Sequence, residues 1–275
     1  MTLELEPTGE RVIEDAYRDS VGAYVIYLMH AASYRFVEEE CRGRDVLDLG
    51  CGSGYGTHRI AGVAASATGV DVAADAVSFA NARYRAANLS FKSIPPDGPL
   101  PFPDEAFDVV LSFQVIEHVR DVGTYLAEAR RVLRPGGMLV VITPDRRHRL
   151  LPGQKPWNRW HLKEYSLQLL EKVIAGVIPV ERALRMGAPW EVARHEMRRY
   201  RWLKWLTLPV TLPFLPEGVR RWGLDAMHRV KGRRAPVAAS ARTGPAVEPG
   251  FGEDAFVFSA DAPNPLNLVV VARKP

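Results

Sequence analysis

Cysteine is scarce in this chain of 275 residues, which contains only Cys41 and Cys51. Two cysteines cannot form a disulfide framework, so a small secreted scaffold is excluded and a reducing, cytoplasmic setting is expected. No uninterrupted apolar run reaches the roughly 18 residues that would suggest a membrane-spanning helix. The first six residues are acidic in balance and lack both a basic start and an apolar core, which argues against a signal peptide.

Metal-binding and nucleic-acid-binding patterns are also missing. No pair of cysteines or histidines stands at ligand spacing, so the sequence predicts no metal site. A net charge of +4 and a pI near 9.1 would suit a nucleic acid, but the basic excess is local. Because no RNA-binding module accompanies it, the sequence predicts no nucleic-acid partner.

The hydrophobic content is sufficient for one sizeable core. With 47% hydrophobic residues in 275, a single domain that carries an elaboration is favoured over two independent domains. Short runs rich in Val, Leu and Ile predict strands near 45–49, 67–71, 90–93, 108–113, 137–143 and 266–272. Helical periodicity appears between them and over 12–40. Alternation of this kind predicts an α/β fold with a mostly parallel sheet covered on both faces.

The strand predicted at 45–49 runs directly into alternating glycines, Gly50, Gly52 and Gly54. Glycine permits sharp turns and positive φ, so backbone N–H groups of this loop can approach a nucleotide-like ligand closely. The frame Gly-x-Gly-x-x-Gly of dinucleotide-binding folds is absent, because neither Gly50 nor Gly52 has glycine at its sixth position. Asp71 ends the next strand about 20 residues on, where a carboxylate chelates a ribose diol. The pattern indicates a ribose-bearing ligand without a pyrophosphate.

Five blocks in this order resemble class I S-adenosylmethionine-dependent methyltransferases. They are Asp48-x-Gly50-x-Gly52-x-Gly54, Asp71, Leu100-Pro101-Phe102 before Phe107-Asp108-Val109-Val110, Ile116-Glu117-His118-Val119, and Leu133-Arg134-Pro135-Gly136-Gly137. The resemblance covers roughly residues 20–185. It implies a Rossmann-like, seven-stranded, mostly parallel sheet with helices on both faces, an antiparallel last strand and a helical cap inserted before that strand.

The resemblance also implies that S-adenosylmethionine is the cofactor. The glycine loop would face its methionine part, the acid after the second strand its ribose, and the segment after the fourth strand the transferred methyl group. The implied cofactor-binding residues are Asp48, Gly50, Gly52, Gly54, Asp71, Val72, Ser93, Phe113 and Gln114. Ser93 departs from the family pattern, which often has an adenine-binding acid there; Asp97 or the backbone alone are the alternatives.

The segment 157–166 follows the fifth strand and mixes aromatic residues with proton donors and acceptors. Its His-x-x-Glu-aromatic stretch resembles a subgroup of these methyltransferases, several of which act in sugar or envelope-polysaccharide pathways. A hydroxyl acceptor must lose its proton, and imidazole titrates near neutral pH, so His161 is the candidate base and His118 its competitor. Each histidine could instead have a structural role. Trp157, Trp160 and Tyr165 are the candidate substrate contacts.

We therefore expect methyl transfer to a small-molecule acceptor, most simply O-methylation of a sugar, a glycan precursor or a secondary metabolite. C-methylation of a quinone- or prenyl-type acceptor is the enzymatic alternative. A module that binds S-adenosylmethionine without turnover is the alternative from another class, since fold does not fix function.

One methyltransferase domain is expected over 1–275. It would comprise an N-terminal helical cap (1–43), a cofactor-binding core (44–186), a variable insertion or lid (187–260) and the final strand (261–275). The insertion is rich in tryptophan and arginine. A basic, aromatic and amphipathic segment can pack as a lid with a solvated face, or it can contact an anionic membrane surface through residues 198–222.

Overall fold

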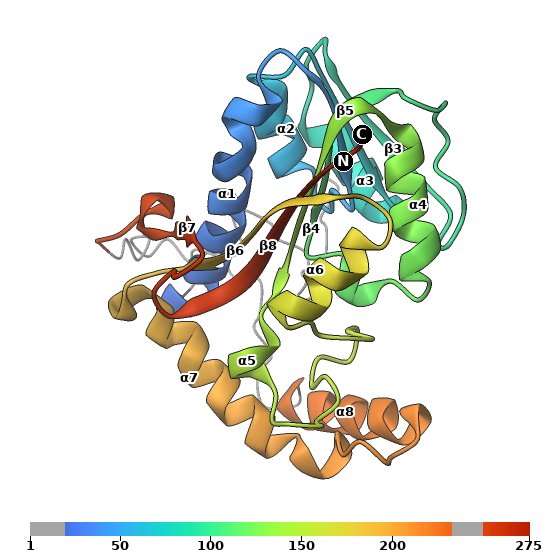
Figure 1. Cartoon of the computed structure of the whole chain (residues 1–275). Coiled ribbons are helices and arrows are strands. Elements are labelled where there is room, and N and C mark those ends of the chain that lie inside the picture. Colours follow the sequence, from blue (N-terminus) through green and yellow to red (C-terminus); the bar gives the residue numbers. More distant parts are fainter. Residues whose placement is uncertain (1–19, 233–249) are drawn as a thin grey trace.

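The computed structural model describes residues 20–232 and 250–275, and one eight-stranded sheet lies at its centre (Figure 1). The strand order is β3-β2-β1-β4-β5-β8-β6-β7. The strands are β1 (Asp45–Leu49), β2 (Ser66–Asp71), β3 (Leu89–Ser93), β4 (Phe107–Phe113), β5 (Leu133–Pro144), β6 (Val180–Gly187), β7 (Val257–Ser259) and β8 (Pro265–Arg273). The expected number of seven strands is wrong, because the short edge strand β7 pairs with the end of β6.

The strand directions confirm the predicted α/β class. Strands β1 to β5 pair in parallel, whereas β8 runs antiparallel to both β5 and β6. The last strand is therefore antiparallel, as the family resemblance implied. All six strands placed from the sequence overlap observed ones, while β6 and β7 were not placed.

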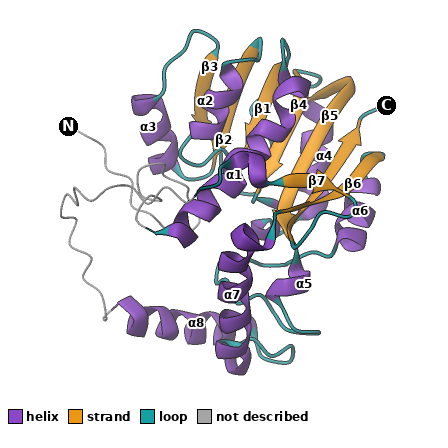
Figure 2. Cartoon of the chain, turned by 90° about the vertical axis from the view of Figure 1, so that its left-hand side faces the viewer, coloured by secondary structure: helices purple, strands orange, loops and turns teal. Residues whose placement is uncertain are grey.

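Helices cover both faces of the sheet (Figure 2). Helix α1 (Val21–Cys41) accounts for the described part of the helical prediction over 12–40, and residues 12–19 lie outside the described range. The other helices are α2 (Tyr55–Ala61), α3 (Ala74–Arg83), α4 (Val122–Val132), α5 (Arg146–Arg149), α6 (Leu167–Ala175), α7 (Trp190–Leu206) and α8 (Glu217–Gly232), with short 3₁₀ turns η2 (Ile116–His118), η3 (Leu208–Val210) and η4 (Glu253–Ala255).

Strand β4 shows how the sequence builds two core layers. Its side chains alternate between faces, so Val109 and Leu111 join a cluster with α1 and α7, whereas Val110 joins a cluster with α4 and α6. All three side chains are fully buried. Burying one such side chain contributes roughly 1.5–3 kcal/mol, so the continuous Val, Leu and Ile runs of the central strands fix this layering.

The strand order reverses direction at β1, which lies between β2 and β4. In open α/β sheets, ligands bind outside the carboxyl ends of the strands at such a point. The segments that follow β1, β2, β4 and β5 meet at this edge, and they contain most of the candidate site residues.

Helices α7 and α8 extend beyond the end of the sheet and form the lower part of the molecule in Figure 1. Helix α7 is anchored from its start to Tyr200, because Val192, Ala193 and Tyr200 are buried in the cluster that contains α1. Across the described residues, no helix is both long enough and apolar enough to cross a bilayer.

Candidate functional site

The glycine loop after β1 has a backbone that only glycine adopts without strain. Gly50, Gly52 and Gly54 have φ values of 92°, 53° and 83°, in the left-handed region that costs other residues roughly 1–2 kcal/mol. A Cβ on Gly50 would lie 2.3 Å from Cγ2 of Val115, so the loop contacts the segment after β4 directly. A Cβ on Gly52 would meet nothing within 4 Å. The loop therefore presents open backbone at Gly52.

Asp71 fixes this loop from the end of β2. Its Oδ2 accepts a hydrogen bond from the N–H of Gly52 at 2.8 Å, and its Oδ1 accepts one from the N–H of Ala73 at 2.8 Å. The carboxylate thus holds the glycine loop and the start of α3 together, and each oxygen retains a second acceptor position. Val72 is 57% exposed beside it. Ser93 is exposed and pairs with Asp71 in the β2–β3 register.

Asp48 lies under the loop and is 1% exposed. Its Oδ2 accepts hydrogen bonds from the hydroxyls of Tyr34 and Thr57 at 3.0 and 2.6 Å, while its Oδ1 has no partner. Burial raises the pKa of Asp48 to about 6, although the two hydroxyls favour the ionised form. The donors to Asp48 are neutral hydroxyls and carry no positive charge. A buried acid with such partners resists ionisation, which is why its pKa stays raised.

The end of β4 contributes Phe113 and Gln114. Phe113 is buried against the ring of Tyr34, with the ring centroids 5.0 Å apart. Gln114 has a φ of 59°, an uncommon value for a residue other than glycine. The N–H of Gln114 donates to the carbonyl of Ile142 at 2.8 Å, which holds this conformation in place. Strained backbone of this kind collects at ligand-binding sites.

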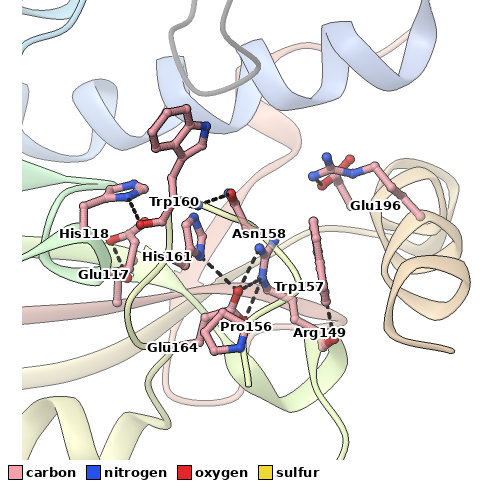
Figure 3. Close-up of polar contacts among 12 residues, drawn as sticks. Glu117, His118, Arg149, Pro156, Trp157, Asn158, Trp160, His161, Glu164 and Glu196 are labelled. Carbon is pink, nitrogen blue, oxygen red and sulfur yellow. Dashed lines mark hydrogen bonds and ion pairs between the residues drawn. The ribbon is translucent and has the colours of Figure 1, made fainter. Parts of the chain in front are cut away.

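Glu117, His118 and His161 come together beyond β4 (Figure 3). Glu117 is 1% and His161 5% exposed, whereas His118 is half-buried. The two imidazole centroids are 4.8 Å apart and the rings are nearly perpendicular. The backbone carbonyl of Glu117 accepts hydrogen bonds from the N–H groups of Leu162 and Lys163 at 2.8 and 3.3 Å. These two bonds bring the segment after β5 to the segment after β4.

His161 is oriented by a buried acid. Its Nδ1 lies 3.0 Å from Oε1 of Glu164, whose carboxylate also accepts hydrogen bonds from Arg149 at 3.0 Å. Burial alone would raise the pKa of Glu164, but the charge of Arg149 and the hydrogen bonds from His161 and Arg149 outweigh it and hold that pKa at about 2. The guanidinium group stacks on the rings of Trp157 and Tyr200, 4.4 and 4.8 Å from their centroids.

The three aromatic residues predicted to contact substrate lie in different surroundings. Trp157 is 8% exposed and its Nε1 donates to the carbonyl of Arg149 at 3.0 Å, so it supports the ion pair. Tyr165 is fully buried in the cluster with α4 and α6. Trp160 is 49% exposed, and its carbonyl lies 3.1 Å from Nδ1 of His118. Trp160 alone of these presents its side chain at the surface.

The insertion holds the segment that contains His161. Arg220 of α8 is 1% exposed and donates to the carbonyls of Pro156, Asn158 and His161. Gln154 bonds the carbonyl of Lys204 in α7 and the hydroxyl of Thr211, both at 2.8 Å. The sequence patterns indicate no role for Arg149, Glu164 or Arg220. The His-x-x-Glu spacing was the available signal for Glu164; nothing local singled out the two arginines.

Comparison with known proteins adds independent evidence. Residues 47–141 match the family model described as a methyltransferase domain. This range contains the glycine loop, Asp71, Gln114 and the Glu117–His118 pair.

Relatives share the surrounding sequence. A protein of Mycolicibacterium smegmatis named as a probable S-adenosylmethionine-dependent methyltransferase is 37% identical over 168 residues, which are 61% of this chain and 62% of that protein. A demethylmenaquinone methyltransferase of Tropheryma whipplei is 35% identical over 134 residues, 48% of this chain and 54% of that protein. The chain therefore matches about three fifths or less of the length of these relatives.

Solved structures share the fold at low identity. A geranyl diphosphate methyltransferase in complex with GPP and sinefungin has a TM-score of 0.55 at 15% identity, covering 96% of this chain and 87% of that one. A [4+2]-cyclase has a TM-score of 0.54 at 18% identity, covering 89% and 82%. These two neighbours have different activities, so the fold alone does not assign one. Taken together, the domain match over residues 47–141 and the named relatives identify the core of this chain as a methyltransferase domain similar to those of S-adenosylmethionine-dependent methyltransferases.

Proposed function

We propose that this chain transfers a methyl group from S-adenosylmethionine to a hydroxyl group of a small molecule. One observation carries the proposal: the glycine loop fixed by Asp71 touches the segment after β4, which leads within two residues to the cluster of Glu117, His118 and His161. A nucleoside held at the loop and an acceptor held at the cluster would therefore be neighbours.

The residues at the edge fit the cofactor. Open backbone at Gly52 allows the methionine part to approach, and the second acceptor positions of Asp71 suit the ribose hydroxyls. Val72 and Ser93 would flank the nucleoside, and Phe113 and Gln114 would border the methyl group. Asp48 would act from below, since it holds Tyr34 and Thr57 beneath the loop.

S-adenosylmethionine, when bound, supplies a methyl group that is already activated. The new O–C bond forms as the S–C bond breaks, the sulfur keeps the electron pair, and the hydroxyl proton is lost. The protein mainly aligns the acceptor about 3 Å from the methyl carbon and excludes water. The hydroxyl proton would be taken up at the cluster, by the imidazole of His161 or of His118.

A carbon acceptor is the second candidate. The name of the T. whipplei relative describes methylation of demethylmenaquinone, which makes a quinone-type acceptor a candidate. A further relative from Rhizobium johnstonii, 34% identical over 106 residues, is named a ubiquinone biosynthesis O-methyltransferase, and that name favours the hydroxyl acceptor. The two chemistries differ in one requirement. Replacing His161 should abolish transfer to a hydroxyl, whereas an activated carbon would lose much less.

The turn between α7 and α8 supports a peripheral membrane contact as part of this proposal. Large apolar side chains at this turn are strongly exposed: Trp202 by 75%, Trp205 by 58%, Leu206 by 61%, Phe214 by 76% and Trp222 by 69%. Exposed arginines accompany them at 198, 201 and 221. Aromatic residues beside cations suit the interface of an anionic bilayer, where a lipophilic acceptor would also be found.

Vesicle sedimentation tests this contact. Wild-type protein should sediment with vesicles of phosphatidylcholine and 30–40% phosphatidylglycerol, and the Trp202→Ala/Trp222→Ala variant should lose at least tenfold in affinity. Trp190→Ala is the matched control, since Trp190 is 52% exposed at the other end of α7. Equal binding of all three proteins, or none by the wild type, would contradict the membrane contact.

Calorimetric titration tests the central proposal. Purified protein is titrated with S-adenosylmethionine, S-adenosylhomocysteine and NAD, and the experiment is repeated on Asp71→Ala. We expect micromolar binding of the two sulfur compounds, none of NAD, and loss of binding in the variant. Binding of NAD alone would overturn the assignment. Binding of S-adenosylmethionine without methylation of hydroxyl or quinone acceptors would instead indicate a non-catalytic module.

A further inference from the structure

Three side chains of metal-ligand type converge at the cluster described above. One ligand atom from each of Glu117, His118 and His161 lies within 4.8 Å of the others. This convergence contradicts the expectation of no metal-ligand pattern, because the two histidines belong to segments that are far apart in the chain. Two histidines and one carboxylate form a ligand set found in catalytic zinc sites and in non-haem iron sites.

One polar atom of each side chain is already held. Nδ1 of His118 lies 3.1 Å from the carbonyl of Trp160, Nδ1 of His161 lies 3.0 Å from Oε1 of Glu164, and Oε2 of Glu117 accepts from Oγ1 of Thr143 at 2.8 Å. Metal-binding histidines nearly always donate their second N–H to a carbonyl or a carboxylate in this way. These contacts fix the orientation of all three side chains.

The second carboxylate oxygen of Glu117 is an independent observation. Oε1 of Glu117 is buried and, among residues 20–232 and 250–275, has no hydrogen-bond partner. A buried polar atom without a partner costs roughly 1–3 kcal/mol, and more if it is charged. A cation at the cluster would satisfy it and remove this cost.

We infer that Glu117, His118 and His161 bind a divalent transition-metal cation, with Zn²⁺ favoured over Mn²⁺ and both over Mg²⁺. Imidazole ligands favour transition metals, whereas Mg²⁺ prefers oxygen ligands. Ligand bonds of about 2.1 Å in tetrahedral geometry place ligand atoms about 3.4 Å apart, so the cluster would contract modestly on binding. Three protein ligands leave one coordination position for another oxygen.

The use of this cation in catalysis rests on the proposed function. A hydroxyl that occupies the open position would have a lower pKa, so its proton could leave to water at neutral pH. The histidines would then be ligands instead of bases. His118 is half-buried, which gives an acceptor access to the cluster from outside.

Metal titration of the full chain tests the inference directly. Protein treated with EDTA and dialysed is titrated with ZnCl₂, MnCl₂ and MgCl₂ by calorimetry, and Co²⁺ loading is followed by its visible absorption bands. We expect one Zn²⁺ per chain and at least 100-fold weaker binding of Mg²⁺. Glu117→Gln, His118→Ala and His161→Ala should each weaken Zn²⁺ binding at least tenfold.

His58→Gln is the matched control, because His58 is exposed and lies outside the cluster. Its Zn²⁺ affinity should stay within twofold of the wild type. If a buried variant fails to fold, the partly exposed His118 variant and the Co²⁺ spectrum of the wild type still decide the question. Absence of stoichiometric binding, or equal losses in the control, would overturn the inference. Titration of the same samples with S-adenosylmethionine keeps the proposed function separately testable.

Discussion

Nη2 of Arg220 donates a hydrogen bond to the backbone carbonyl of His161 at 3.3 Å. The same guanidinium group reaches the carbonyls of Pro156 and Asn158 at 2.7 and 3.1 Å, so one side chain of α8 fixes the backbone before the histidine cluster. Arg220 thus connects the insertion to the candidate acceptor site. The insertion therefore contributes to the geometry of this segment.

Replacement of Arg220 by methionine should loosen this segment. The three carbonyls would lose their donor, and we expect a loss of about 2–4 kcal/mol in unfolding free energy. Methyl transfer should fall at least tenfold in kcat, while the Kd for S-adenosylmethionine stays within twofold. Urea unfolding, turnover and calorimetry measure the three quantities.

Glu217→Gln is the control for this prediction. Glu217 pairs with Arg220 but its side chain is 47% exposed and it makes no bond to the segment. Its replacement should leave kcat nearly unchanged. If the Arg220→Met variant lost as much affinity for S-adenosylmethionine as it loses in kcat, the prediction would be wrong. Arg220 would then support the cofactor site as well as the acceptor segment.

Much of the central sheet could be predicted because its signals are local. Apolar runs identify β1, β4 and β8, and the alternating glycines mark the turn after β1. Strand β6 escaped detection because Glu181, Arg182 and Arg185 interrupt its apolar pattern, and β7 is only three residues long. These strands form by pairing with β8 and with each other, which local patterns cannot express.

The candidate site could be predicted only in part, because many of its contacts join segments that are far apart in the chain. The glycine loop and Asp71 stand at a fixed offset that the sequence displays. The ion pair between Arg149 and Glu164, the bonds from Arg220 and the approach of His118 to His161 all join segments that are separated in the chain. Such contacts depend on tertiary structure, so residue type and spacing did not reveal them.

Two glycines of the loop should respond differently to alanine. Gly50→Ala combines a φ of 92° with a Cβ 2.3 Å from Cγ2 of Val115, and we expect a loss of about 2–4 kcal/mol in unfolding free energy. Gly52→Ala meets no atom within 4 Å and should cost only about 1 kcal/mol. Its methyl group would nevertheless fill the space over the backbone of Gly52 that we assign to the cofactor. The affinity for S-adenosylmethionine should therefore fall at least tenfold.

Thermal unfolding and calorimetry on the two variants check this contrast. Equal destabilisation of both would show that the contact with Val115 is unimportant. Full cofactor affinity in Gly52→Ala would move the ligand away from the loop.

Removal of the negative charge of Glu164 should lower the unfolding free energy, because the buried guanidinium group of Arg149 would lose its counter-ion. Glu164→Gln leaves the guanidinium group without its anionic partner at 4% side-chain exposure, and we expect a loss of about 3–5 kcal/mol at pH 7. The pKa of Glu164 is lowered from 4.5 to about 2, so its contribution is present above pH 4.5 and disappears as pH falls toward 2. Unfolding curves of variant and wild type should therefore converge in acid.

The double variant Arg149→Met/Glu164→Gln is the control for that prediction. It removes both charges, so it should recover much of the stability that the single variant loses. If the double variant is no more stable than the single one, the packing of Arg149 on Trp157 and Tyr200 matters more than its charge.

Asp48 should show the opposite dependence on pH. Its pKa is raised from 3.8 to about 6 because burial penalises the ionised form and the hydroxyls of Tyr34 and Thr57 compensate only in part. As pH rises from 3.8 to 6, the unfolded chain loses this proton first, so Asp48 lowers stability over that window. Two pKa units correspond to about 3 kcal/mol.

Asp48→Asn keeps an oxygen that can accept from both hydroxyls but removes the titration. Relative to this variant, the wild type should lose about 3 kcal/mol of unfolding free energy between pH 4 and pH 7, measured by urea unfolding at each pH. Parallel plots of unfolding free energy against pH would mean that the pKa of Asp48 is not shifted. A wild type that gains stability from pH 4 to pH 7 would mean that a cation pairs with Asp48. Asp48 and Glu164 are both buried acids, so opposite slopes would show that the partner, a hydroxyl or a guanidinium group, decides the sign.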